Sequence, residues 1–287
     1  MEMGGALPPG AQGSLPTLVI QPAGRFAAID FRELWAYRGL FWFLVWRDIK
    51  VRYAQTVLGA GWAVLQPLLT TLLFTVIFGT FAKIPSDGVP YAAFAITALV
   101  PWTYFSTALT GASTSLVSST NLITKVYFPR LVIPAAPVLA GLLDFFIGMV
   151  IILAMVVGYG LTPSPLALVI VPIVVVVMAL TAAGVGSWLA ALNIQYRDIR
   201  YVVPFLVQVW MYASPVVYPA SVVPERFRLV YALNPMVGVI EGLRAAFLGT
   251  GRVGWSTIGV SLGMGLLLFV GGVLYFRRVE RTFADVA

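Results

Sequence analysis

The sequence contains no cysteine and no histidine among its 287 residues. These two absences exclude disulfide bonds, zinc sites built from Cys and His, thiol nucleophiles and the Ser-His-Asp arrangement of hydrolases. Charged residues are also scarce, at 10% of the chain against about 25% in soluble domains. Because so few charges cannot solvate a chain that is 60% hydrophobic, with a mean hydropathy of +0.94, the composition indicates an integral membrane protein.

The sequence also lacks a phosphate-binding loop, since G-x-x-x-x-G-K-S/T occurs nowhere in it. If the chain takes part in an ATP-driven process, a partner must therefore bind and hydrolyse the ATP. Residues 1–24 have no basic start and no continuous apolar core, so we expect no cleavable signal peptide. Glycine and proline are frequent at the N-terminus, which predicts a flexible cytoplasmic tail over residues 1–28.

Uncharged segments fill most of the remaining chain, and about 20 apolar residues suffice for one helical span. Polar links such as KIPSDG and GYGLTPSP, together with clusters of arginine, separate these segments. We therefore predict an all-α polytopic membrane protein, with its transmembrane domain over residues 53–287. Its six predicted spans lie near residues 57–81, 90–117, 131–158, 166–192, 201–218 and 255–276.

The cations indicate how these spans are oriented. If both termini lie on one side, that side carries Arg25, Arg32, Arg38, Arg47, Lys50, Arg52, Lys125, Arg130, Arg197, Arg200, Arg277, Arg278 and Arg281. The other side carries Lys83, Arg226, Arg228, Arg244 and Arg252. Because cytoplasmic loops are enriched in cations, we predict that both termini are cytoplasmic. The net charge of +7 then reflects topology and gives no support to nucleic-acid binding.

Residues 29–52, before the first span, are predicted to form an amphipathic helix at the membrane interface. Apolar residues recur there at helical spacing, and the charged residues lie largely elsewhere on the helical wheel. This helix could be a passive anchor, a moving gate or a contact for a partner. Its apolar positions are Phe31, Leu34, Trp35, Trp42, Val45, Trp46 and Ile49.

Two short helical patterns occupy residues 224–249, on the outer side between spans five and six. Asn234 followed by Pro235 favours a helix start, and Glu241 and Arg244 are spaced for an i,i+3 ion pair. Since each helix is too short to cross the bilayer, we predict a hairpin that partly re-enters the outer leaflet. A surface hairpin that only covers neighbouring spans is the alternative.

Asp144 is the only charged residue between Leu131 and Tyr196, and it lies within the third predicted span. Such residues are costly in a bilayer and suggest either proton coupling or a structural hydrogen bond. No other predicted span carries a charge that could pair with it. Two short cytoplasmic links, residues 121–130 and 193–204, gather cations that either anchor the chain at the membrane or dock a partner.

Five stretches of the sequence are informative when they are considered together. They are RDIKVRYAQTVLGAGWAVLQPLL (47–69), LVPWTYFS (99–106), NLITKVYFPR (121–130), YRDIRYVVPFLVQVWMYASPVVYP (196–219) and LNPMVGVIEGLRAAFLG (233–249). Together they resemble the permease subunit of ABC-type polysaccharide exporters, and the resemblance extends over nearly all of the chain from residue 30 to the end. That family moves lipid-linked O-antigen, capsular polysaccharide or teichoic acid across the bacterial inner membrane.

The resemblance implies a transport subunit with no ATPase of its own. It implies a homodimer working with two copies of a cytoplasmic ATPase, on which ATP and Mg would be bound, and with membrane lipids and the polysaccharide as further partners. Residues 118–130 would form a coupling loop on that ATPase, although the family often has further basic residues where this chain has Ala54 and Thr124. The implied coupling contacts are Asn121, Lys125, Tyr127 and Arg130, and the implied outer gate includes Asn234, Pro235, Glu241 and Arg244.

A sugar polymer needs a pathway that binds it weakly and repeatedly, and aromatic rings can stack on sugar faces. The candidate channel aromatics are Trp62, Trp102, Tyr104, Phe105, Trp210, Tyr212 and Tyr218, although Trp and Tyr are enriched at membrane interfaces in any case. For a phosphate on the lipid end, the candidate contacts are Arg47, Lys50 and Arg52, which membrane anchoring explains equally well. The rival functions are a related drug or lipid permease, an intramembrane glycosyl- or acyltransferase, and a proton-driven transporter.

Overall fold

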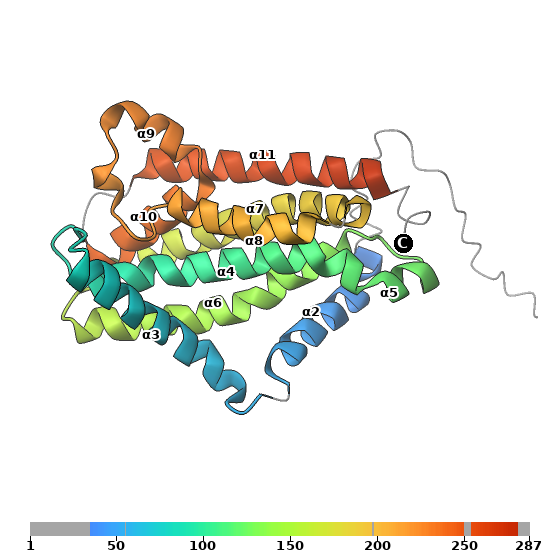
Figure 1. The fold of residues 1–287 in the computed structure, drawn as a ribbon, viewed down its shortest axis with the longest axis horizontal. Coiled ribbons are helices and arrows are strands. Elements are labelled where there is room, and N and C mark those ends of the chain that lie inside the picture. Colours follow the sequence, from blue (N-terminus) through green and yellow to red (C-terminus); the bar gives the residue numbers. More distant parts are fainter. Residues whose placement is uncertain (1–34, 55, 197, 250–253, 281–287) are drawn as a thin grey trace, which may run out of the picture.

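The computed structural model describes residues 35–54, 56–196, 198–249 and 254–280, and every regular element within these ranges is a helix (Figure 1). In chain order the elements are α2 (Arg38–Tyr53), η1 (Gly59–Gly61), α3 (Trp62–Phe74), η2 (Thr75–Phe81), α4 (Tyr91–Ser118), α5 (Thr120–Lys125), α6 (Val132–Gly158), α7 (Ala167–Gln195), α8 (Ile199–Tyr212), η3 (Ala220–Val222), α9 (Glu225–Ala232), α10 (Pro235–Leu248) and α11 (Trp255–Glu280). The predicted tail, residues 1–28, and the start of the predicted interface helix, residues 29–34, lie outside the described residues.

Several of these helices are long and apolar enough to cross a membrane. Within the described residues there are five such segments: Gly59–Phe81, Tyr91–Ser118, Val132–Gly158, Ala167–Gln195 and Trp255–Glu280. They overlap the ranges predicted for spans one, two, three, four and six. The prediction of an all-helical protein with several apolar, membrane-length helices is therefore confirmed.

The region of the predicted fifth span has a different form. Here α8 has only 14 residues and ends at Tyr212, and turns follow over residues 213–218. A helix of that length is about 21 Å long, which is shorter than the hydrocarbon core of about 30 Å. The expectation of one helix over residues 201–218 was wrong, because Pro215 disfavours helical backbone at the residue before it. The turns instead bury Val216 and Val217 in the core.

Helix α4 is the centre of the bundle. Over an 18-residue stretch of α4, 78% of the residues are buried, compared with 6% over a stretch of the same length in Gly59–Phe81. It packs against α6 and α7 along its length and also contacts α10 and α8. Its most buried side chains include Phe94 and Phe105, so the main hydrophobic core lies around this helix.

Helices α7 and α11 form the closest helix pair. A Cβ atom on Gly272 of α11 would overlap the carbonyl oxygen of Gly184 on α7, so the two backbones touch directly at this crossing. Small residues permit such close approach between apolar helices, where dispersion contacts replace a hydrophobic driving force. The pair fixes the position of the last helix against the bundle.

Helices α2 and α3 form the two arms of a V, and the end of α2 and the start of α3 lie farthest from the long helices (Figure 1). Helix α2 is held against α6 through Leu44 and Val45, whereas Trp42 and Trp46 on its other side are exposed. Most of α3 is also exposed, although its composition is strongly apolar. These surfaces need lipid or another protein chain to cover them.

The elements that connect the long helices gather at two opposite ends of the molecule (Figure 1). At one end lie α5, the start of α8 and the end of α11; we call it the α5 end. At the other lie α9, α10 and the turn between α3 and α4; we call it the α9 end. The candidate functional residues fall mainly at these two ends.

Candidate functional site

At the α5 end, the loop of residues 118–130 is a fixed projection from the bundle. Ile123 and Phe128 are 7% and 4% exposed, and they anchor the loop in a hydrophobic cluster that includes Phe276 of α11. Between these anchors the side chains point outward. The exposed residues are Thr124, Lys125, Val126 and Tyr127 between the anchors, and Ser118 and Asn121 before the first anchor. The sequence thus provides a rigid platform with one cation, one aromatic ring and one amide on its surface.

Arg130, the fourth predicted contact of this loop, has a different environment. Its backbone N–H donates to the Glu280 carboxylate at 3.3 Å, and its Nη1 donates to the Glu280 backbone carbonyl at 2.7 Å. Cations are stabilised at helix C-termini, where backbone carbonyls lack helical partners. Arg130 therefore ties the loop to the end of α11, whereas Asn121, Lys125 and Tyr127 remain at the surface.

The seven predicted channel aromatics do not line one common surface of the chain. Trp102, Tyr104 and Phe105 are buried in the core around α4, and the Tyr104 hydroxyl donates to the Val138 carbonyl at 3.2 Å. By contrast, Trp62 and Tyr212 are 45% and 53% exposed. A packing role explains the buried three, while Trp62 and Tyr212 are free to face a pathway or lipid.

Trp210 belongs to a hydrogen-bonded junction centred on Asn234, whereas the Tyr218 hydroxyl donates to the Tyr212 carbonyl at 2.9 Å. The Asn234 amide oxygen accepts from Trp210 Nε1 at 2.9 Å and from the Met236 backbone N–H at 3.1 Å, so it also caps α10. Its Nδ2 donates to Ser214 Oγ at 2.9 Å and to the Ala213 carbonyl. This junction joins the end of α8 to the start of α10. The next residue, Pro235, occupies the first turn, where a missing N–H costs nothing.

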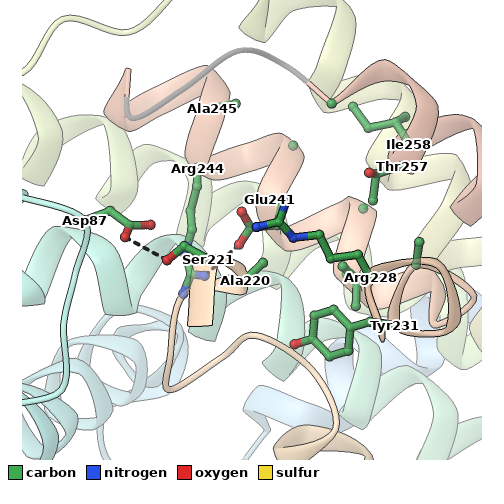
Figure 2. Close-up of a pocket in the computed structure, with 15 residues that line it drawn as sticks. Asp87, Ala220, Ser221, Arg228, Tyr231, Glu241, Arg244, Ala245, Thr257 and Ile258 are labelled. Carbon is green, nitrogen blue, oxygen red and sulfur yellow. Dashed lines mark hydrogen bonds and ion pairs between the residues drawn. The ribbon is translucent and has the colours of Figure 1, made fainter. Parts of the chain in front are cut away.

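The predicted pair of Glu241 and Arg244 is present on α10, with Nη1 of Arg244 2.9 Å from the Glu241 carboxylate (Figure 2). Arg244 is only 3% exposed, and its guanidinium lies 3.5 Å from the centre of the Phe94 ring. Its Nη2 donates to the Val216 carbonyl at 3.3 Å. Burial lowers the pKa of Arg244, and the neighbouring Glu241 carboxylate opposes that shift. The sequence indicated the ion pair but gave no sign that Arg244 is buried.

Asp144 has two partners that the sequence analysis missed. Its carboxylate accepts hydrogen bonds from the Arg52 guanidinium and from the Tyr53 hydroxyl, both at the end of α2. A cavity of about 400 Å³ borders this cluster and is also lined by Trp62 and Gln66. The partners come from the helix before the first span, 92 residues away in sequence, so no pattern within the spans could identify them.

The three candidate headgroup cations of α2 also have neighbours within the chain. Arg47 pairs with Asp48 at 2.8 Å, and the Lys50 ammonium lies 5.6 Å from the centre of the Trp46 ring. Arg52 pairs with Asp144. Arg47 and Lys50 retain exposed surface for an anionic group, whereas the charge of Arg52 is already matched.

Comparisons with known proteins agree on one family. The family model for "ABC-2 type transporter" matches residues 39–248. The O-antigen export system permease protein RfbA of Myxococcus xanthus is 34% identical over 218 residues, which are 75% of this chain and 83% of that protein. The protein of the same name from Klebsiella pneumoniae is 29% identical over 240 residues, covering 84% of this chain and 92% of its own length. The polysialic acid transport protein KpsM of Escherichia coli is 24% identical over 246 residues, covering 82% and 91%.

Proposed function

The chain belongs to the ABC-2 type transporter family, and we propose that it is the membrane subunit of an ATP-driven exporter that moves a lipid-linked polysaccharide across the bacterial inner membrane. One observation carries this proposal: the family match spans α2 to α10, and its relatives named for O-antigen export are similar over at least 83% of their own length. Similarity to capsule-type transport proteins supports polysaccharide as the substrate class.

The proposed topology has six spans with both termini in the cytoplasm. Helix α8 and the turns after it form the fifth span, and the buried side chains of α10 support a hairpin of α9 and α10 that enters the outer leaflet. Backbone of this irregular kind is tolerated at membrane depth where protein surrounds it. The cation distribution supports a cytoplasmic α5 end and an outer α9 end.

The α5 end is the proposed docking site for a separate ATPase, which binds ATP and Mg. Asn121, Lys125 and Tyr127 are exposed on a loop whose position is fixed by Ile123 and Phe128. Because these two buried side chains hold the loop against the bundle, a force that the ATPase applies to the loop moves the bundle as well. Through Arg130 and Glu280 the force also reaches the end of α11.

A homodimer is the proposed working unit. Helices α3 and α8 expose apolar surface, including Leu72 at 60% and Phe205 at 68%, that a second copy can cover. A two-fold symmetric pair presents two docking loops to two ATPase subunits and closes without leaving open interfaces. Substrate then passes between the copies, where Trp62 and Tyr212 are exposed and able to stack on sugar rings.

In this mechanism ATP binding brings the two ATPases together and presses both docking loops toward the membrane. Helix α4 leads directly into the loop, so the central helix moves with it against α3 and α8. The Asn234 hydrogen bonds connect α8 to the outer hairpin, which couples the outer exit to the same movement. Hydrolysis and release return the helices to their starting positions.

The test is co-purification of the tagged protein from its own host in a mild detergent. The wild-type protein is expected to recover an ATPase in near-equimolar amount. The double variant Lys125→Glu/Tyr127→Ala should lose that ATPase, because both changed side chains are exposed and neither supports the fold. Lys83→Glu, a charge reversal at the α9 end, is the matched control and should retain it.

The polysaccharide is tested in the same host. Deletion of the gene should leave the polysaccharide inside the cell, and Lys125→Glu/Tyr127→Ala should fail to restore it to the surface. An ATPase retained by this variant, or none recovered with the wild type under conditions that preserve a control exporter, would refute the docking assignment.

A further inference from the structure

The α9 end contains a cavity of about 270 Å³ that is separate from the proposed pathway aromatics and the docking loop (Figure 2). Its walls come from five segments: the α3–α4 turn, η3, α9, α10 and the start of α11. The polar side chains that line it are Asp87, Ser221, Arg228, Tyr231, Glu241, Arg244 and Thr257. So many polar groups around a cavity of this size suggest a polar ligand.

The buried arginine of this cavity is held in place by partners within the protein. Arg244 directs one nitrogen to Glu241 and one to the Val216 carbonyl, and it stacks on Phe94. Its Nε is fully buried and has no hydrogen-bond partner among the described residues. Because this nitrogen has no accessible surface, a ligand in the cavity does not reach it, and Arg244 acts on a ligand through its positive charge.

The mouth of the cavity carries the second arginine and the acids. Arg228 is 56% exposed, and Glu241 is 35% exposed. Asp87 accepts a hydrogen bond from Ser221 at 3.0 Å, which links the α3–α4 turn to η3. Burial raises the pKa of the Tyr231 hydroxyl, as does its hydrogen bond with Tyr218, so this group stays protonated. The cavity therefore offers both donors and acceptors around its rim.

The charged and hydroxyl groups around the cavity favour one class of ligand. Two guanidinium groups face two carboxylates, so the cavity has no excess positive charge to hold a phosphate, and Glu241 and Asp87 would repel one. Hydroxyl groups, in contrast, donate to carboxylates and accept from guanidinium and hydroxyl groups at the same time. The Tyr231 ring adds an apolar surface of the kind that stacks on a sugar face.

We propose that this cavity binds one sugar unit of the glycan as it leaves the outer side of the protein, with Arg228, Glu241 and Thr257 as its hydrogen-bonding groups. The proposal rests on the proposed function for the direction and substrate of transport. The cavity volume lies below the range of about 300–1,000 Å³ that holds drug-sized ligands, so it admits a single unit. A bound sugar bridges α9 to α10 and α11 and so joins the parts of the outer hairpin.

The test is saturation-transfer NMR on the full chain in lipid nanodiscs. The probes are fragments of one to three sugar units released by mild acid from the surface polysaccharide of the host. We expect weak, saturable binding to the wild-type protein, and Arg228→Gln and Thr257→Val should each weaken it about tenfold. Arg226→Gln is the matched control, since Arg226 lies on α9 but does not line the cavity, and it should bind as the wild type does.

Three results would overturn the proposal: no saturable binding of the fragments, equal binding by the Arg226 and Arg228 variants, or displacement of the fragments by inorganic phosphate. This assay requires no ATPase, so its outcome is independent of co-purification. If an ATPase is recovered but the fragments do not bind, the sugar site is refuted and the exporter assignment stands. If the fragments bind but no ATPase is recovered, the exporter assignment fails and the sugar site stands.

Discussion

At the scale of single residues, Asp144 illustrates how a charge is accommodated inside an apolar helix. Its carboxylate is matched by the Arg52 guanidinium and the Tyr53 hydroxyl, and the side chains of Asp144 and Arg52 are 29% and 28% exposed. A buried or half-buried ion pair gives little net stability, but removing one partner leaves the other charge uncompensated. The pair therefore ties α2 to α6 without any need for proton transfer.

Asp144→Asn is therefore expected to destabilise the protein by about 1–3 kcal/mol, because the Arg52 charge loses its counter-ion. The double variant Asp144→Asn/Arg52→Gln removes both charges and should recover most of that loss, together with transport. Thermal unfolding in nanodiscs and surface polysaccharide in cells measure the two effects. If the double variant regains stability but stays inactive, the carboxylate has a role in transport itself, as a proton-coupled mechanism would require.

Asn234 accepts hydrogen bonds through its amide oxygen and donates them through its amide nitrogen, and substitutions can separate these two roles. Asn234→Asp keeps the acceptor that caps α10 and receives Trp210, but it loses the donor to Ser214 and Ala213. Asn234→Ala loses both, so it should destabilise the start of α10 by about 0.5–2 kcal/mol from the cap alone. Hydrogen exchange of residues 235–240 measures this. We expect the fastest exchange in the Ala variant, an intermediate rate in the Asp variant and the slowest in the wild type, and equal rates in all three would contradict the assignment.

At the scale of helices, the crossing of α7 and α11 depends on two glycines. Gly272→Ala places a methyl group on the Gly184 carbonyl, so the helices must separate and lose contact along the crossing. We expect a loss of about 1–3 kcal/mol in stability, as for other overpacked interiors. Gly271→Ala is a matched control on the same helix, since a Cβ there meets nothing within 4 Å. If both variants lower the unfolding temperature equally, the loss does not come from the contact between α7 and α11.

The helices also show which parts of the fold a sequence reveals. The five long spans could be predicted because the thickness of the hydrocarbon core fixes a minimum length, which an uncharged run such as Gly59–Phe81 reaches. The end of α8 could not be placed by hydropathy, because residues 213–218 are as apolar as the helix before them and Pro215 ends it locally. The pairing of Arg52 with Asp144 depends on how α2 packs against α6, which is a contact between distant segments.

At the scale of the whole molecule, the exposed apolar surfaces of α3 and α8 distinguish one protomer from a complete transporter. Leu72 of α3 and Phe205 of α8 are 60% and 68% exposed, and within the chain α3 packs mainly against α4 and α6, whereas α8 packs mainly against α4 and α7. In a symmetric dimer the two helices can meet across the interface. In a monomer both would face lipid only.

Because the chain has no native cysteine, an introduced thiol is unique, and thiol cross-linking can distinguish the dimer from the monomer. Leu72→Cys and Phe205→Cys are placed in two differently tagged copies, co-expressed in the host membrane and treated with a short bifunctional maleimide. A dimer through α3 and α8 is expected to give a cross-linked product that carries both tags. Leu267→Cys on α11, which is 65% exposed, replaces Phe205→Cys as the control and should give none. Equal cross-linking from the control indicates random collision, and no product from the first pair excludes the interface, since the thiols would then face lipid in separate chains.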